Sequence, residues 1–409
     1  MIREVLKGIT VVDFTQIGAG PTCTMLLSDM GARVIKVEPL GGEIGRSLGP
    51  AWVGKDAALF HGFNRGKQGI ALNIKSEEGR EVALALIGRA DVVVESMRPG
   101  AMARAGLGYE QLRGKFPRLV YCSISAYGQQ GPYAGRAGVD GVLQADSGLM
   151  SLIGMPNGEP CKVQAPVVDV MTGYVACMGV LASLSQRDRT GHGEYVDASL
   201  LNSALALQQP SISSYFADGV VPSPIGSAAP YSAPNQAFHT ADGWIMVAAY
   251  MPERWNNLCQ VLKRPDLLDD PRFQTSPLRV KNLGALTATL TETFRTRSCA
   301  DWLVELEQAD ILCTKVADYA DLDRHPQIRA NRMLVDLDLG ERGSLRVPGF
   351  PLNSCQANAA SYLRAPDLGE HTEAILAELG YSEEKIARMR AGGAVFCSSG
   401  LPSAVDCHE

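Results

Sequence analysis

The first 200 residues alternate between short β-rich runs and amphipathic helical patterns, and this alternation constrains the fold more than any other feature of the chain. The predicted strands lie at 9–14, 33–38, 70–74, 91–96, 119–125 and 194–198. The clearest helical patterns between them lie at 21–30, 77–89 and 169–186. Strands that alternate with helices form βαβ units, which build a mainly parallel sheet with helices on its faces. We therefore expect an α/β fold that binds ligands beyond the carboxyl ends of its strands.

The character of the chain changes near residue 205. Residues 206–234 are rich in Ser, Pro and Gly and have no clear period, so they are predicted to form a linker or loop. A hairpin is predicted at 236–249, because Asp242-Gly243 separates two β-rich runs. Helical patterns follow at 253–262, 283–294 and 299–308. These elements predict a smaller α+β domain at 235–330.

The last part of the chain contains one strand pattern and two helical patterns. The strand is predicted at 344–347, and the helices are predicted to begin after Leu368 and to occupy 382–390. Residues 396–409 are expected to form a loose tail.

Composition excludes several classes of protein. A length of 409 residues suggests roughly two to three domains. The formal net charge of -6 argues against nucleic acid as a partner. No segment reaches the ~18 uninterrupted apolar residues expected of a membrane span, and the N-terminus has no signal-peptide pattern. The sequence therefore predicts a cytoplasmic protein without a membrane partner.

The ten cysteines are scattered and form neither a C-x-x-C pair nor a Cys/His group at metal spacing. They are predicted to be reduced and mostly buried, and Cys407-His408 favours a stray thiol over a metal ligand. We predict no metal site.

Asp169 is the most suggestive single residue. It stands before a long apolar helical pattern, and no other acid occurs between Glu159 and Asp188. A poorly hydrated carboxylate is costly for the fold and is a good nucleophile. Asp is also a preferred helix N-cap, and the two roles can coexist.

The turn at 15–21 follows the first predicted strand and precedes a helix, so its backbone N–H groups could bind an anion. It is not a dinucleotide fingerprint, because Cys23 stands where the third glycine should be, and a nicotinamide oxidoreductase is therefore disfavoured. Basic residues gather on loops after the strands: Lys36, Arg46, Arg65, Lys67, Lys75, Arg98, Arg104 and Arg136. Such cations in an acidic chain suggest a multiply charged anionic ligand, and Arg98 stands where parallel sheets bind phosphates.

Asp140 begins another helical run and is predicted to be a helix cap. The histidines His61, His192 and His239 have no Ser or Cys partner at a recognisable spacing, and no G-x-S-x-G elbow is present. A serine or cysteine hydrolase is therefore poorly supported.

Taken together, the motifs of the chain resemble class III coenzyme A transferases. That family includes formyl-CoA transferase and the carnitine CoA-transferases and shares its fold with α-methylacyl-CoA racemase. The segments that carry the resemblance lie at 8–14, 31–38, 64–67, 94–100, 189–197 and 368–372, and the whole resemblance spans about 6–395. It implies a Rossmann-like large domain built from 1–205 and 331–395, a smaller domain, and an interlocked homodimer.

The resemblance also implies the chemistry of the site. The family's nucleophilic Asp matches Asp169, which would form an aspartyl mixed anhydride and then an aspartyl-CoA thioester. CoA would be a substrate, and no tightly bound cofactor is expected. The positions implied to contact CoA are Gly18, Ala19, Leu72, Asn73, Ile74, Lys75, Ser96, Met97, Arg98, Arg104, Arg136, Ala137 and Val139.

The chain departs from formyl-CoA transferase in two places. Pro39 replaces a base, and residues 226–231 replace a run of glycines, so that enzyme's small substrates are disfavoured. The loop at 226–234 most resembles members that use succinyl-CoA and short dicarboxylates such as itaconate, and Arg46 with nearby bases could hold a second carboxylate. A racemase is the second hypothesis. It ranks below the transferase because racemases have a His before the acid, where this chain has Val139-Asp140, and two-base proton exchange would lack its partner. A catalytically silent CoA-binding protein is the third.

Overall fold

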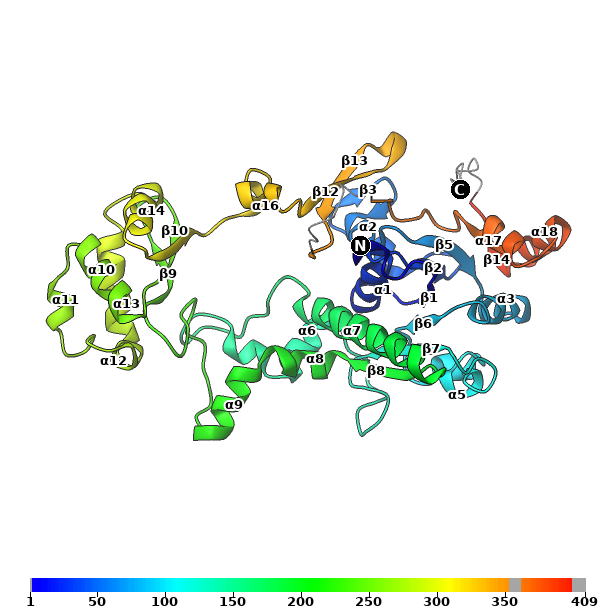
Figure 1. Ribbon diagram of the computed structural model, residues 1–409, viewed down its shortest axis with the longest axis horizontal. Coiled ribbons are helices and arrows are strands. Elements are labelled where there is room, and N and C mark those ends of the chain that lie inside the picture. Colours follow the sequence, from blue (N-terminus) through cyan, green and yellow to red (C-terminus); the bar gives the residue numbers. More distant parts are fainter. Residues whose placement is uncertain (1, 353–361, 399–409) are drawn as a thin grey trace. The chain divides into compact units, whose positions relative to one another are not determined.

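The structure, a computed structural model, describes residues 2–352 and 362–398 (Figure 1). The chain divides into two compact units. A large unit comprises Met1–Leu149, Lys162–Val220 and Ala330–Glu409, and a small unit comprises Met150–Cys161 and Val221–Arg329. The small unit thus includes a segment near residue 155 that was predicted to belong to the large domain.

A seven-stranded sheet forms the centre of the large unit, in the order β14-β5-β2-β1-β6-β7-β8. Six strands run parallel: β1 (Thr10–Phe14), β2 (Arg33–Glu38), β5 (Gln68–Leu72), β6 (Val92–Glu95), β7 (Val120–Ser125) and β8 (Tyr195–Ser199). The predicted parallel α/β sheet is therefore confirmed. From β1 the chain builds outward through β2 and β5, and then returns to the other side of β1 to add β6, β7 and β8.

Alternate residues of the strands supply two separate cores, as the period of two in a strand requires. On one face, strand residues such as Val11 and Val92 pack with α1 (Ala19–Asp29), α7 (Val167–Thr190) and α8 (Leu200–Leu207). On the other face, residues such as Val12 and Val93 pack with α3 (Glu77–Ile87), α17 (Thr372–Glu378) and α18 (Glu383–Ala391).

The edge of the sheet at β5 is closed by the end of the described chain. β14 (Val395–Phe396) pairs with β5 in antiparallel fashion, next to it in Figure 1. The Gly69 N–H donates to Nδ1 of His371 (3.1 Å), and the Ala71 N–H donates to Oγ1 of Thr372 (3.2 Å). The motif at 368–372 therefore has a structural role at this edge.

Helix α7 is, among the described residues, long and apolar enough to cross a membrane, by length and composition only. Its buried residues, Ala176 and Val180 among them, belong to the core that covers the sheet. This packing identifies α7 as a core helix of the large unit.

The small unit contains the predicted hairpin, formed by β9 (Asn235–His239) and β10 (Trp244–Ala248). β11 (Leu312–Lys315) adds to β10 and completes a three-stranded antiparallel sheet. Its core includes residues of α10 (Pro252–Val261), α13 (Leu283–Phe294) and α14 (Cys299–Gln308).

The remaining elements are short. In the large unit they are η1 (Ile2–Glu4), η2 (Ile44–Ser47), β3 (Trp52–Val53), β4 (Asp56–Ala57), α2 (Ala58–Asn64), α4 (Ala101–Arg104), α5 (Tyr109–Leu112), α6 (Asp140–Asp146), α9 (Gln209–Asp218), β12 (Leu334–Asp338), η4 (Gly340–Arg342) and β13 (Ser344–Pro348). The small unit adds α11 (Asp266–Asp269), α12 (Ser276–Lys281) and α15 (Tyr319–Leu322). Two elements straddle the unit boundaries, η3 (Leu149–Leu152) and α16 (Pro326–Ala330).

The predicted linker at 206–234 was wrong in its first part, because α9 occupies Gln209–Asp218. Pro210 stands in the first turn of this helix, and Gly219 ends it with φ 72°. These two signals are typical helix boundaries, and the Ser-rich composition between them obscured the helix.

Eight of the cysteines are described; all eight are free, and six of them are buried. Among the described residues, no group of three or more His, Cys, Asp or Glu could hold a metal ion. Cys407, His408 and residues 399–409 of the predicted tail lie outside the described residues.

Gly173 lets α7 pack directly on α1. A Cβ at Gly173 would lie 2.5 Å from Cβ of Thr22 and 2.7 Å from the carbonyl oxygen of Ala19. Gly173→Ala should therefore lower the free energy of unfolding by roughly 1–3 kcal/mol, the usual cost of overpacking. Gly62→Ala in α2 is the control, because nothing lies within 4 Å of that added Cβ.

The control should be neutral or stabilising by up to about 1 kcal/mol, since Ala is the better helix former. Urea unfolding of both variants provides the measurement. Equal stabilisation by the two substitutions would contradict the close packing of α1 on α7.

Candidate active site

Two loops meet where the direction of strand addition reverses. β1 and β6 are neighbours in the sheet, and the loops after them begin at Thr15 and Ser96. The Gln16 N–H donates to Oγ of Ser96 (3.1 Å), so the two loops are joined. Open parallel sheets bind ligands at this kind of switch point, beyond the carboxyl ends of the strands.

Asp169 lies against the first of these loops. It is the third residue of α7, and a Cβ added to Gly18 would lie only 2.5 Å from Oδ2 of Asp169. Gly18 is the N-cap residue of α1, and its helix end has no side-chain cap. Only glycine allows the backbone to approach the carboxylate this closely, so the N-terminal end of α1 borders Asp169.

Asp140 caps the helix that carries Asp169. Its Oδ2 accepts hydrogen bonds from the N–H groups of Val168 (2.8 Å) and Asp169 (3.1 Å). Asp140 was predicted to cap its own helix, and instead it caps α7. This contact answers the question of the α7 cap, because the N-cap position is Pro166, which has no side-chain cap, and Asp169 is the third residue of the helix.

Gln144 supports Asp140 from the next turn of α6. Its Nε2 donates to Oδ1 of Asp140 (2.5 Å), and its side chain also bonds the backbone N–H and carbonyl of Val163. Gln144 and Asp140 are both buried. The irregular segment at Val163 and the start of α7 are thus fixed by one pair of side chains, whose joint role the sequence analysis missed.

The carboxyl group of Asp169 is partly buried and unusually basic. Burial, and after it the negative charge of Asp140, raises the pKa of Asp169 to about 7. The N-terminal turn of α7 acts in the opposite direction, because a helix dipole favours a carboxylate by about 0.3–1 kcal/mol. Perturbed carboxylates of this kind at the edge of a parallel sheet are typical of functional sites.

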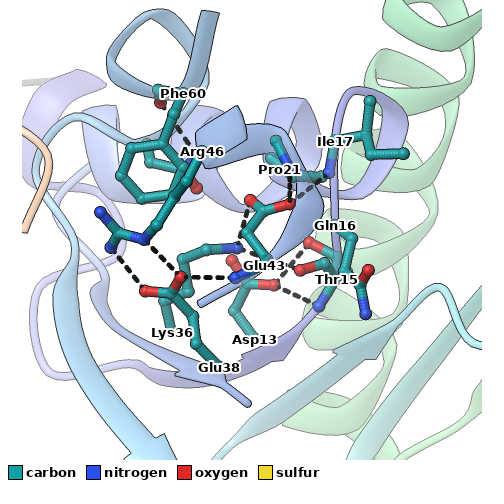
Figure 2. A network of polar contacts seen from close by, with 12 residues as sticks. Asp13, Thr15, Gln16, Ile17, Pro21, Lys36, Glu38, Glu43, Arg46 and Phe60 are labelled. Atoms are coloured by element: carbon teal, nitrogen blue, oxygen red, sulfur yellow. Dashed lines mark hydrogen bonds and ion pairs between the residues drawn. The ribbon is translucent and has the colours of Figure 1, made fainter. Parts of the chain in front are cut away.

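A buried network holds the loop at 15–18 in place (Figure 2). Oδ1 of Asp13 accepts from the N–H (2.8 Å) and Oγ1 (2.6 Å) of Thr15, and Nζ of Lys36 donates to the Thr15 carbonyl (3.0 Å). Oε2 of Glu43 accepts from the N–H of Ile17 (2.8 Å). Ile17 has φ 67°, a costly conformation for a β-branched residue, and this contact with Glu43 helps to hold it.

Asp13 is charged in this network. Burial alone would raise its pKa, but the ammonium groups of Lys67 and Lys36 and hydrogen bonds from Thr15 and Thr24 outweigh burial and hold the pKa of Asp13 well below its usual range. Nζ of Lys67 lies 3.0 Å from Oδ2 of Asp13. The loop beside Asp169 therefore rests on fixed buried charges.

Arg46 does not have the role suggested for it. Its guanidinium binds both carboxylate oxygens of Glu38 (2.7 Å each) and Oδ2 of Asp56 (3.0 Å), and it stacks on Phe60 with 3.8 Å to the ring centroid. Figure 2 shows Arg46 with Glu38 and Phe60. Every nitrogen of the group has a partner in the protein. Arg46 therefore holds the loop after β2, and its buried guanidinium is already paired with two carboxylates of the protein.

The eight cations noted in the sequence fall into two groups. Four are buried and paired with acids, in the pairs Lys36–Glu43, Arg46–Glu38, Arg65–Asp29 and Lys67–Asp13. The side chains of the other four are exposed and make no ion pair within 2–352 and 362–398: Lys75, Arg98, Arg104 and Arg136. Arg136 stacks on Tyr133, 4.4 Å from the ring centroid.

The predicted CoA-contact residues lie at or after the carboxyl ends of parallel strands of the large unit. Gly18 and Ala19 follow β1, Leu72–Lys75 end and follow β5, and Ser96–Arg98 follow β6. Arg104 is the last residue of α4, and residues 136–139 lie between β7 and α6. Their assignment to CoA stays a prediction.

Comparison with known proteins identifies the family. The profile of CoA-transferase family III matches residues 6–372. This chain belongs to that family. It is therefore an enzyme that transfers coenzyme A.

The human succinyl-CoA:glutarate CoA-transferase is 34% identical over 392 residues, which cover 95% of this chain and 90% of that protein. The succinyl-CoA:mesaconate CoA-transferase of Haloarcula marismortui is 35% identical over 384 residues, which cover 92% and 96%. A crystal structure of a CAIB/BAIF family protein from Brucella suis has a TM-score of 0.83 and 36% identity, and covers 92% of this chain and 99% of that chain. The chain therefore has the fold of these relatives over nearly its whole length. The interlocked dimer and the cytoplasmic location stay predictions.

Removing the charge of Asp140 should change the pH dependence of CoA transfer. If the Asp169 carboxylate is the reactive form, activity is lost as pH falls through its pKa of about 7. Asp140→Asn keeps an oxygen that can cap α7 but removes the negative charge, so the pKa of Asp169 falls and the acid limb of the pH–rate profile moves to lower pH. Asp146→Asn on the same helix, an exposed position, is the control. An acid limb at the same pH in Asp140→Asn and wild type would refute the coupling.

Proposed function

We propose that this enzyme transfers CoA from succinyl-CoA to a short dicarboxylic acid of the C4–C5 class, such as itaconate, through covalent catalysis by Asp169. The observation that carries the proposal is the position of Asp169, a partly buried carboxylate at the switch point of the sheet against Gly18. The relatives that act on glutarate and mesaconate with succinyl-CoA support the choice of acids.

The reaction would proceed in four steps with no net change in protons. The Asp169 carboxylate attacks the thioester carbonyl and expels CoA thiolate, which forms an aspartyl mixed anhydride. The thiolate then attacks the Asp169 carbonyl carbon, releases the donor acid and leaves an aspartyl-CoA thioester. The acceptor carboxylate attacks that thioester to form a second anhydride, and CoA thiolate attacks its acyl carbonyl, which releases the new acyl-CoA and restores Asp169. Each bond that breaks is replaced by an activated bond, so the thioester energy is conserved.

The surroundings of Asp169 suit these steps. The N-terminal end of α1 borders the carboxylate at Gly18, and the free N–H groups of a helix start stabilise the oxyanions that develop during acyl transfer. Asp140 and Gln144 fix the start of α7, so Asp169 is positioned before the substrate arrives. Because its pKa lies at about 7, a large share of Asp169 is ionised at neutral pH while its hydration is poor.

Asp169→Ala should abolish CoA exchange and leave CoA binding largely intact, because the variant removes the nucleophile but no predicted CoA contact. Intact-protein mass spectrometry after mixing with succinyl-CoA and quenching with hydroxylamine or borohydride should show conversion at residue 169 in wild type only. Asp188→Ala, which removes an exposed Asp from the same helix, should behave like wild type. Near-wild-type turnover by Asp169→Ala would remove the nucleophile assignment, and deuterium exchange at Cα of a branched acyl-CoA would favour the racemase.

Acceptor acids provide an independent test of the substrate class. With succinyl-CoA as donor, kcat/KM for itaconate, mesaconate and glutarate should exceed that for butyrate and valerate by roughly tenfold or more, since a charged hydrogen bond to the second carboxylate contributes about 1.5–3 kcal/mol. Steady-state rates with matched chain lengths provide the comparison. A preference for monocarboxylates would end the dicarboxylate proposal and leave the family assignment untouched.

A further inference from the structure

Glu95 is a buried acid at the centre of the sheet that the proposed mechanism does not use. It is the last residue of β6, with Phe14 of β1 and Ser123 of β7 as its neighbours in the register. Its relative exposure is 5%, and among the described residues no Lys or Arg forms an ion pair with it. Burying a carboxylate without a cation costs free energy, so we expect Glu95 to have a function at the carboxyl end of β6.

The hydrogen bonds of Glu95 shape the turn that follows it. Oε2 of Glu95 accepts from the N–H of Met97 (2.8 Å), and the Ser123 side chain also bonds the carboxylate. Ser96, between Glu95 and Met97, accepts from the Gln16 N–H through its Oγ. The turn at 96–98 is therefore held from inside the sheet by Glu95 and tied sideways to the loop that borders Asp169.

We propose that Glu95 is a positioning residue that holds the 96–98 turn in its CoA-binding conformation, and that it does so as the carboxylate, which makes CoA binding depend on pH. The proposal rests on the proposed role of Ser96, Met97 and Arg98 as CoA contacts. Glu95 itself, at the buried end of β6, acts through this turn and not on the substrate.

The groups around Glu95 explain why its pKa is raised. Ser123 and Tyr121 lie on the same face of β7 as Glu95 does of β6, Tyr195 and Asp197 follow on β8, and none of them is a cation. Burial raises the pKa of Glu95 to about 7; the bonds from Ser123 and Met97 lower it, and the charge of Asp197 raises it.

The sign of the effect follows from this pKa. Above about pH 7, Glu95 is a carboxylate that accepts from both donors. Below it, one carboxyl oxygen becomes a donor while it faces the Met97 and Ser123 donors, and the bond that shapes the turn is weakened. CoA affinity should therefore fall as pH decreases from 8 to 6.

The test measures CoA binding by calorimetry in an Asp169→Ala background, so that the titration of Asp169 does not contribute. If only the carboxylate form is competent, the Kd for CoA should rise by roughly tenfold from pH 8 to pH 6, beyond any part due to the 3′-phosphate of CoA. Glu95→Gln keeps an oxygen that accepts from Met97 and cannot ionise, so it should lose this part of the pH dependence. Glu95→Ala should bind weakly at both pH values.

Three results would overturn the proposal. Glu95→Gln could keep the pH dependence of the parent, or Glu95→Ala could bind CoA as tightly as the parent at pH 8 while remaining folded. Arg98→Ala distinguishes the proposed CoA contact of the 96–98 turn from the proposed role of Glu95. If it leaves CoA affinity unchanged, the turn is no CoA contact and both proposals about this turn fail; if it weakens binding while Glu95→Gln still follows the parent's pH profile, only the role of Glu95 fails.

Discussion

The contact between the first turns of α1 and α7 determines the arrangement of the whole site. Gly173 lets the two helices touch, and Gly18 lets the start of α1 meet the Asp169 carboxylate. Asp140, on a third helix, then fixes the first turn of α7. Because each of these contacts allows so little space, the carboxylate can take few positions relative to the sheet, and the geometry of the candidate site is a result of core packing.

The cations near the ends of the large unit's strands are of two kinds, buried ones paired with acids and exposed ones. Buried pairs such as Lys67–Asp13 and Arg46–Glu38 hold the loops after β1 and β2, and they are partnered within the protein. Exposed cations such as Arg98 and Arg104 lie on segments that follow β6, where the protein gives them no acid as partner within the described ranges. An acidic chain thus keeps positive charge available at one edge of its sheet, where a polyanion would be attracted.

The sequence predicted what depends on local pattern and missed what depends on tertiary contact. Strand 33–38 and helices 283–294 and 299–308 were predicted at their observed bounds, because hydrophobic periodicity and helix caps depend on residues that are close together in the sequence. Asp169 stood out for a similar reason, as a lone acid before an apolar helix. The capping of α7 by Asp140 could not be predicted, since it joins residues that are 28 and 29 positions apart in the sequence. Arg46 was misassigned because the sequence around it does not indicate that Glu38 and Asp56 are its partners.

The closure of the sheet by β14 has a consequence for how the chain is made. The strand that covers the edge of β5 comes from a segment about 320 residues later, after the whole small unit. During synthesis, β5 therefore leaves the ribosome as an open edge and stays so until nearly all of the described chain has been translated. Open strand edges recruit other strands, so the nascent chain carries a risk of wrong pairing at β5 during this interval that the finished fold no longer has.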